Sequence, residues 1–208
     1  MRIYAVHLAH PLKLSVKILP SPGSPSAAES VSIALCVARG MWAIHAAGIA
    51  HADIKSHNVL MMGPGSAIIG DLGTAEFLPP SGIVKMDHCE SDYPYWSPEY
   101  RSSGRLSTSS DVYCFGIMLA ELTVGRTMYH DASLFRDPIQ ALVRDGRDTF
   151  RRNAAWDRAT RDIIVHLAAK CLLPHARDRL DAAACIAALD THTDVCTPTP
   201  SAKRKRVE

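Results

Sequence analysis

The stretch that most constrains this chain of 208 residues is a polar segment, residues 51–58, placed directly before the apolar run 59–62. Thirteen positions after Asn58 (71 − 58), a second apolar run, 67–69, leads into Asp71-Leu72-Gly73. Short apolar runs bounded by polar residues predict two strands. Asp53 and Asn58 precede the first strand, and Asp71 follows the second. Carboxylate and amide oxygens suit Mg²⁺, which keeps waters and shares its shell with phosphates.

This segment resembles the catalytic loop of eukaryotic-type protein kinases, in which the pattern H-R-D-x-x-x-x-N precedes D-F-G. His51, Asp53 and Asn58 match the first pattern, and Ala52 stands in place of its Arg. Asp71 and Gly73 match the second pattern, and Leu72 stands in place of its Phe.

Three further motifs follow in the family's order. Ser97-Pro98-Glu99 resembles A-P-E, and residues 111–116 resemble the helix start D-V-W-S-F-G. Arg179 resembles the late Arg that pairs with the A-P-E glutamate. Five motifs in sequence over roughly residues 30–190 make the chain similar to a serine/threonine protein kinase catalytic domain. The resemblance implies an α+β fold, with a mainly helical C-lobe and a few short strands at the cleft.

The resemblance also implies a division of the chain. Residues 1–20 are expected to be a remnant of the N-lobe (last strand, hinge and short helix), 21–29 a loop, 30–190 the C-lobe and 191–208 a disordered basic tail. The run 14–19 mimics the family's phosphate-binding strand, but only 36 positions (53 − 17) separate Lys17 from Asp53. The favoured register therefore makes His7 and Ala9 part of the hinge that faces adenine.

In this register most of the N-lobe sheet is absent, and the glycine-rich loop, the phosphate-holding Lys and its Glu partner have no candidates. We expect either a fragment of a longer kinase or a naturally shortened relative. Helices are expected from an N-cap at Ser30 to Gly48, over 111–122, over 159–173 and over 180–189. The face of the first helix that is expected to turn to the core comprises Val31, Ala34, Leu35, Ala38, Met41, Trp42 and His45.

The resemblance assigns roles to the polar residues. Asp53 would orient the substrate hydroxyl and accept its proton, and Lys55 would neutralise the γ-phosphate, as in the serine/threonine branch. Asn58 and Asp71 would hold Mg²⁺ between the phosphates of ATP, and Leu60 would line the floor of the adenine pocket. These residues also have a purely structural explanation. Asp and Asn are common in turns, which would account for Asp53 and Asn58, and Leu60 could simply pack in the core.

Other residues would be structural. His51 is expected to be a core histidine satisfied by backbone and packed beneath Leu72. Asp111 would be buried and accept backbone N–H bonds from the catalytic loop, although a helix N-terminus favours an Asp as well. Glu99 and Arg179 would form a buried ion pair.

Ala52 occupies the position at which the family has an Arg that binds a phosphorylated activation loop. We therefore expect that phosphorylation of the activation loop does not switch this chain on. The leading hypothesis is an ATP- and Mg²⁺-dependent serine/threonine kinase acting on protein substrates. The alternative is a pseudokinase that acts as a protein-binding module without turnover.

Composition limits the other classes. A net charge of +2 gives no general drive toward nucleic acid, and we expect no membrane span. The six cysteines include no C-x-x-C pair, which favours a reducing, intracellular compartment. The basic run 203–206 could recruit a nuclear import receptor, contact nucleic acid or solubilise the chain end, and it favours a cytoplasmic or nuclear location.

Overall fold

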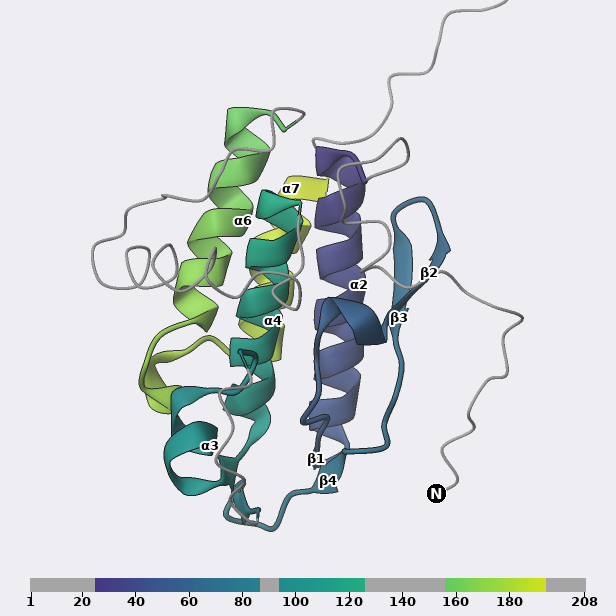
Figure 1. Ribbon diagram of the computed structural model, residues 1–208. Helices are drawn as coiled ribbons and strands as arrows, with labels where there is room; N and C mark the ends of the chain where they lie inside the picture. The colour runs from purple at the N-terminus through teal and green to yellow at the C-terminus, as the bar shows by residue number, and fades with distance from the viewer. Residues whose placement is uncertain (1–24, 87–93, 126–155, 194–208) are drawn as a thin grey trace, which may run out of the picture.

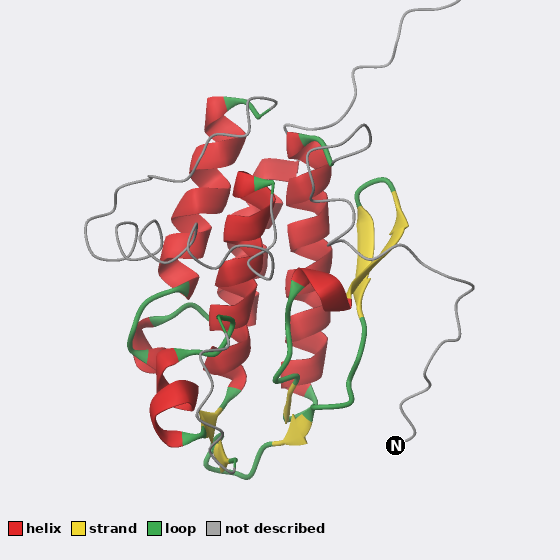
Figure 2. Cartoon of the chain, viewed as in Figure 1, coloured by secondary structure: helices red, strands yellow, loops and turns green. Residues whose placement is uncertain are grey.

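The computed structural model describes residues 25–86, 94–125 and 156–193, with side chains described to residue 191. Four longer helices run alongside one another and make up most of this part; a small helix (residues 98–103) and the two-residue strands lie at one end, and a β-hairpin lies along the first long helix (Figures 1 and 2). The expected hinge residues His7 and Ala9 and the basic tail lie outside the described residues. The helices and 3-10 turns are α2 (Ala27–Ala46), η1 (Ser56–Asn58), α3 (Pro98–Ser103), α4 (Thr108–Val124), α6 (Arg158–Cys171), η2 (Ala176–Asp178) and α7 (Ala182–Thr193).

Helix α4 lies at the centre of the core. It is apolar on every side, and Phe115, Ile117, Met118 and Leu119 are completely buried. It packs closely against α6, while α2 packs closely against α7. Gly125 ends α4 in the left-handed conformation (φ +70°), which glycine adopts without steric cost. The described helix is longer at both ends than the predicted range 111–122.

Helix α2 begins four residues earlier than the sequence predicts. Ser26, not Ser30, is the N-cap: its side chain accepts the Glu29 N–H, and the Glu29 carboxylate accepts the Ser26 N–H. The first turn of α2 therefore occupies the end of the predicted loop 21–29. Trp42 is 51% exposed, so its assignment to the core face was wrong.

Helix α2 is also long and apolar enough to be a candidate membrane span by length and composition alone. Half of that window is buried inside the structure, where α2 contacts α7, α4 and α6. Packing in the core accounts for its apolar character.

The described strands form three two-stranded antiparallel ladders. β1 (Ile49–Ala50) pairs with β4 (Glu76–Phe77), β2 (Val59–Gly63) with β3 (Ser66–Ile69), and β5 (Val84–Lys85) with β6 (Arg105–Leu106). The β2–β3 hairpin is the strand pair predicted from the two apolar runs. It lies along α2 (Figure 1), where Gly40 is so close to Ile69 that an added Cβ would meet its Cδ1 at 3.2 Å.

The last two helices depart from their predicted ends. Helix α6 ends at Cys171, two residues before the predicted Leu173. Helix α7 begins at Ala182 rather than Leu180, because the Asp181 carboxylate accepts the N–H of Ala184 as an N-cap does. It continues to Thr193, so the start of the predicted tail, residues 191–193, is helical.

Candidate active site

The catalytic-loop residues converge on the carboxylate of Asp53. Its Oδ2 lies 2.7 Å from Lys55 Nζ and accepts a hydrogen bond of 2.7 Å from Asn58 Nδ2. The same Asn58 nitrogen donates to the Asp53 carbonyl at 2.9 Å. Asn58 is buried on the turn η1, which follows directly from the loop. The predicted positions 53, 55 and 58 are therefore brought together.

The hairpin carries Asp71 to the same place. The Gly70 N–H donates to the Asn58 carbonyl at 2.7 Å, one residue before Asp71. Leu60 packs against this backbone, since a Cβ on Gly70 would lie 3.0 Å from its Cδ1. Leu60 thus borders the segment that carries Asp71, and its place on the floor of an adenine pocket stays a prediction.

Asp71 has a strained backbone. Its φ of +63° falls in the left-handed region, which costs a residue with a Cβ about 1–2 kcal/mol. Its carboxylate is exposed, and Oδ1 accepts a long hydrogen bond of 3.4 Å from the Gly73 N–H. Ala52 is the only other non-glycine residue with positive φ (+67°) in the described part of the chain. Strained backbone of this kind concentrates at functional sites, and here the two strained residues belong to the two predicted motifs.

The donor set fits a magnesium–phosphate complex. Because Asn58 directs its amide nitrogen at Asp53, its oxygen is the group left to accept a cation. One amide oxygen and one exposed carboxylate, Asp71, match Mg²⁺, which is bound by one or two carboxylates plus waters and substrate phosphates. Within the described residues no group of three or more His, Cys, Asp or Glu side chains could hold a metal. The two oxygen donors that are present, from Asn58 and Asp71, suit a metal that shares its coordination shell with waters and phosphates.

Asp111 holds the loop from beneath. Its completely buried carboxylate accepts the His51 N–H at 2.7 Å (Oδ2) and the Ala52 N–H at 2.8 Å (Oδ1), as the sequence predicts. A third contact was not predicted: His45 Nε2 lies 2.9 Å from Asp111 Oδ2. Helix periodicity placed His45 only on a core face, and no local pattern pairs it with a residue 66 positions away.

His51 links the two motifs through its backbone and ring. It is completely buried, with Nε2 3.1 Å from the Gly70 carbonyl, which fits the expected core histidine. Its own carbonyl accepts the Thr74 hydroxyl at 3.2 Å. Leu72, which stands between Gly70 and Thr74 in the sequence, is half-buried, and its carbonyl accepts the Ala75 N–H.

The predicted ion pair between Glu99 and Arg179 is present. Arg179 Nη2 and Nη1 donate to the two carboxylate oxygens of Glu99 at 2.7 and 2.8 Å. The remaining guanidinium donors reach three carbonyls, and the group stacks 5.0 Å from the centre of the Tyr113 ring. These carbonyls belong to Leu173, Pro174 and Ser109.

The charge state of Glu99 follows from this geometry. Burial alone raises the pKa of Glu99, but the hydrogen bonds and the positive charge of Arg179 outweigh it, so the pKa lies below its ordinary value. The pair therefore stays ionised, and it fixes α3, which begins at Pro98, to the segment between α6 and α7.

The segment before Ser97 is tied to α4 at two points. The Tyr95 hydroxyl donates a hydrogen bond to the buried carboxylate of Glu121, and the Cys114 thiol donates to the Tyr95 carbonyl at 3.1 Å. Burial raises the pKa of the Cys114 thiol well above its ordinary value, so Cys114 remains a neutral donor. Sequence motifs did not indicate either contact.

Comparison with known proteins identifies the family of this chain. The family model for the protein kinase domain matches residues 13–189. The chain therefore belongs to the protein kinase family, and the described part corresponds to its helical C-lobe.

Curated relatives include plant kinases. The receptor-like serine/threonine-protein kinase NCRK of Arabidopsis thaliana is 29% identical over 195 residues, 84% of this chain and 34% of that protein. The probable serine/threonine-protein kinase PBL28 of the same plant is 38% identical over 104 residues, 45% of this chain and 27% of that protein. The chain thus spans about a third or less of the length of these relatives.

Proposed function

We propose that this chain acts as a serine/threonine protein kinase, transferring the γ-phosphoryl group of ATP to a Ser or Thr hydroxyl of a protein with the help of Mg²⁺. The observation that carries the proposal is the convergence of Lys55 and Asn58 on the carboxylate of Asp53. Phosphoryl transfer requires positioned groups and charge neutralisation more than covalent chemistry, and this cluster offers both.

Each side chain has a definite task in this proposal. The Asp53 carboxylate, fixed by the Asn58 amide, accepts the proton of the attacking hydroxyl. Lys55, whose side chain is only 16% exposed, lies beside Asp53 and can turn its ammonium to the transferred phosphoryl group. Asn58 and Asp71 hold the Mg²⁺, which would neutralise the charge of the phosphates.

The proposed serine/threonine specificity has two supports. Lys55 stands two residues after Asp53, as in the serine/threonine branch of the family. The plant relatives also carry serine/threonine kinase names, although the chain covers only part of each.

The test is transfer of labelled γ-phosphate from Mg·ATP to a degenerate peptide library that contains Ser, Thr and Tyr acceptors. We expect label on Ser and Thr, and a loss of roughly 10²–10⁴-fold in Asp53→Asn, because the proton acceptor is removed. Asp178→Asn, an exposed position on η2, is the matched control and should leave transfer unchanged. Equal rates for the wild type and Asp53→Asn would overturn the proposal, and Mg·ATP binding without transfer would favour the binding-module alternative.

A further inference from the structure

Two cysteines that the proposed chemistry does not use lie against each other in the core. Cys171, the last residue of α6, and Cys185, in the first turns of α7, have their sulfur atoms 3.7 Å apart. Both side chains are completely buried. A disulfide has a sulfur–sulfur distance of about 2.05 Å, so the two thiols are already neighbours and need only a short approach.

From this contact we infer that Cys171 and Cys185 form a modification site, a dithiol that a small disulfide compound oxidises to a cross-link between α6 and α7. Because the fold holds the two sulfurs together, their effective concentration for ring closure is high, which favours the oxidised form at equilibrium. The other described cysteines differ: Cys114 donates to the Tyr95 carbonyl, and Cys36 is directed at the Gly65 carbonyl.

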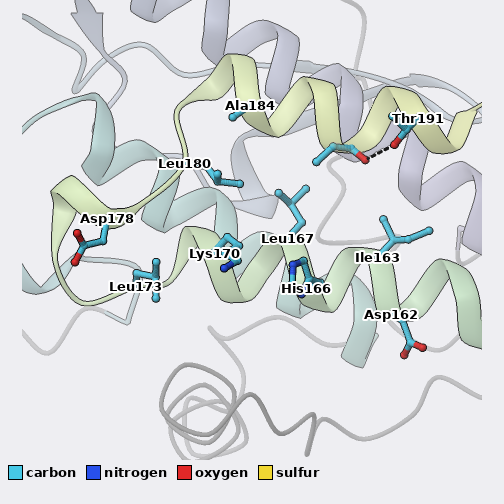
Figure 3. A pocket seen from close by; sticks show the side chains of 11 residues that line it. Asp162, Ile163, His166, Leu167, Lys170, Leu173, Asp178, Leu180, Ala184 and Thr191 are labelled. Carbon is cyan, nitrogen blue, oxygen red and sulfur yellow. Dashed lines mark hydrogen bonds between the residues drawn. The ribbon is translucent and has the colours of Figure 1, made fainter.

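A cavity lies beside this pair of helices. It has a volume of about 800 Å³ and lies between α6 and α7, where Lys170, Leu167, Leu180 and Ala184 form part of its wall (Figure 3). Lys170 and Ala184 directly precede Cys171 and Cys185 on their helices. Neither cysteine lines the cavity, so α6 and α7 must separate locally for a reagent in the cavity to reach the sulfurs.

The reaction is a pair of thiol–disulfide exchanges. One cysteine, as its thiolate, attacks a sulfur of the small disulfide, whose S–S bond breaks and releases one thiolate that takes up a proton. The second cysteine then attacks the mixed disulfide and releases the other half as a thiol. The protein loses two electrons and two protons, and the small disulfide is reduced to two thiols. The hydrogen bond with Cys185 and burial raise the pKa of the Cys171 thiol, so an attack that begins at Cys171 is slow.

The cross-link would enclose the segment that carries Arg179. Between the two cysteines, the Leu173 and Pro174 carbonyls accept hydrogen bonds from the Arg179 guanidinium. The same guanidinium donates to the Glu99 carboxylate. Closing this loop removes conformational freedom from the unfolded chain and so stabilises the arrangement. An effect of the cross-link on phosphoryl transfer would depend on the proposed kinase function. Formation of the cross-link itself does not depend on that function.

The test uses the full chain with Cys196→Ser, incubated folded with oxidised glutathione, alkylated and digested with trypsin. The substitution is needed because the tryptic peptide 180–203 would otherwise contain Cys196 as well as Cys185. We expect peptide 171–177 joined to peptide 180–203, separable by a reducing agent. We also expect the oxidised protein to melt roughly 5–10 °C higher than the reduced one.

Control variants keep the result specific. Cys185→Ala should abolish both the joined peptide and the rise in melting temperature, while Cys36→Ala should change neither. Absence of the joined peptide from folded protein, its formation only in urea, or an oxidised form that melts no higher than the reduced form would overturn the inference. None of these measurements depends on ATP or on phosphoryl transfer, so a failure here is distinct from a failure of the proposed kinase function.

Discussion

Arg179 and Glu99, 80 residues apart in the sequence, form a two-pronged ion pair in which both carboxylate oxygens accept a guanidinium nitrogen. The Arg179 side chain has no exposed surface, whereas that of Glu99 is 19% exposed. Planar two-point pairing is the geometry in which an Arg–carboxylate contact is strongest. The pair fixes the start of α3 against the connection from α6 to α7.

Removing one partner should be costly. Arg179→Met leaves the Glu99 carboxylate partly buried without its counter-charge and three carbonyls without their donor, so we expect a loss of about 3–5 kcal/mol in the free energy of unfolding. Urea denaturation measures it. Arg177→Met is the matched control two residues away, with a side chain 85% exposed, and should change stability by less than about 0.5 kcal/mol.

Acid should weaken the same contact. The ordinary pKa of Glu99 is 4.5, and in the folded chain it is lower because of Arg179. Above pH 4.5 the carboxyl is charged in both the folded and unfolded states, so its stabilisation is fully present. Below that value the unfolded chain binds the proton first, and the stabilisation is lost as the pH falls through the folded pKa.

Unfolding by urea over pH 3–6 checks this, with Glu99→Gln for comparison. The wild type should lose more stability than Glu99→Gln below pH 4.5. Parallel curves for the two proteins would show that the pair does not contribute to the acid response.

The contact of His45 with Asp111 predicts a graded effect. His45→Leu removes a hydrogen-bond partner of the buried carboxylate and should cost about 1–3 kcal/mol, whereas His45→Gln can still donate and should cost less. Hydrogen exchange of the His51 and Ala52 amides, both bound to Asp111, measures whether the loop loosens. Equal exchange in the two variants would contradict a role for the His45 hydrogen bond.

Gly116 is required by close packing of α4 on α6. A Cβ at this position would lie 2.8 Å from Cys171 Cβ and 2.9 Å from Leu172 Cγ, closer than such atoms approach. Gly116→Ala should therefore cost about 1–3 kcal/mol in unfolding free energy through overpacking. Gly40→Ala is the helical control, because its Cβ would meet the movable Cδ1 end of Ile69 at 3.2 Å and its Cγ1 at an ordinary contact distance of 3.4 Å. A neutral Gly116→Ala would show that α6 can shift away freely.

Much of the site could be predicted because its residues recur at fixed spacings. Asp53 and Asn58 lie within one short loop, and the hairpin that brings Asp71 back to them is marked by two apolar runs. The pairing of Glu99 with Arg179 came from family resemblance alone, since no local pattern links residues so far apart. The same limit explains why the contacts of Asp111 with His45 and of Glu121 with Tyr95 were missed.

Element ends were less predictable, for local reasons. The sequence Ser26-Ala27-Ala28-Glu29 contains the capping-box pattern, but the apolar run that begins at Val31 favoured an N-cap at Ser30 instead. Asp181 similarly caps α7 after the predicted start at Leu180. Trp42 fits the spacing of the core face yet is half exposed, because apolar periodicity tolerates a large residue at the edge of a buried stripe.

We propose that Asn58 and Asp71 form, beside Asp53, one site for the metal-bound phosphates of ATP. The most direct measurement is the shift in melting temperature caused by Mg·ATP in the wild type and in Asp71→Ala, with Asp178→Ala as the control. We predict a rise in the wild type and the control that increases with ligand concentration, and its loss in Asp71→Ala. Equal shifts in all three proteins, or no shift in the wild type, would contradict the claim.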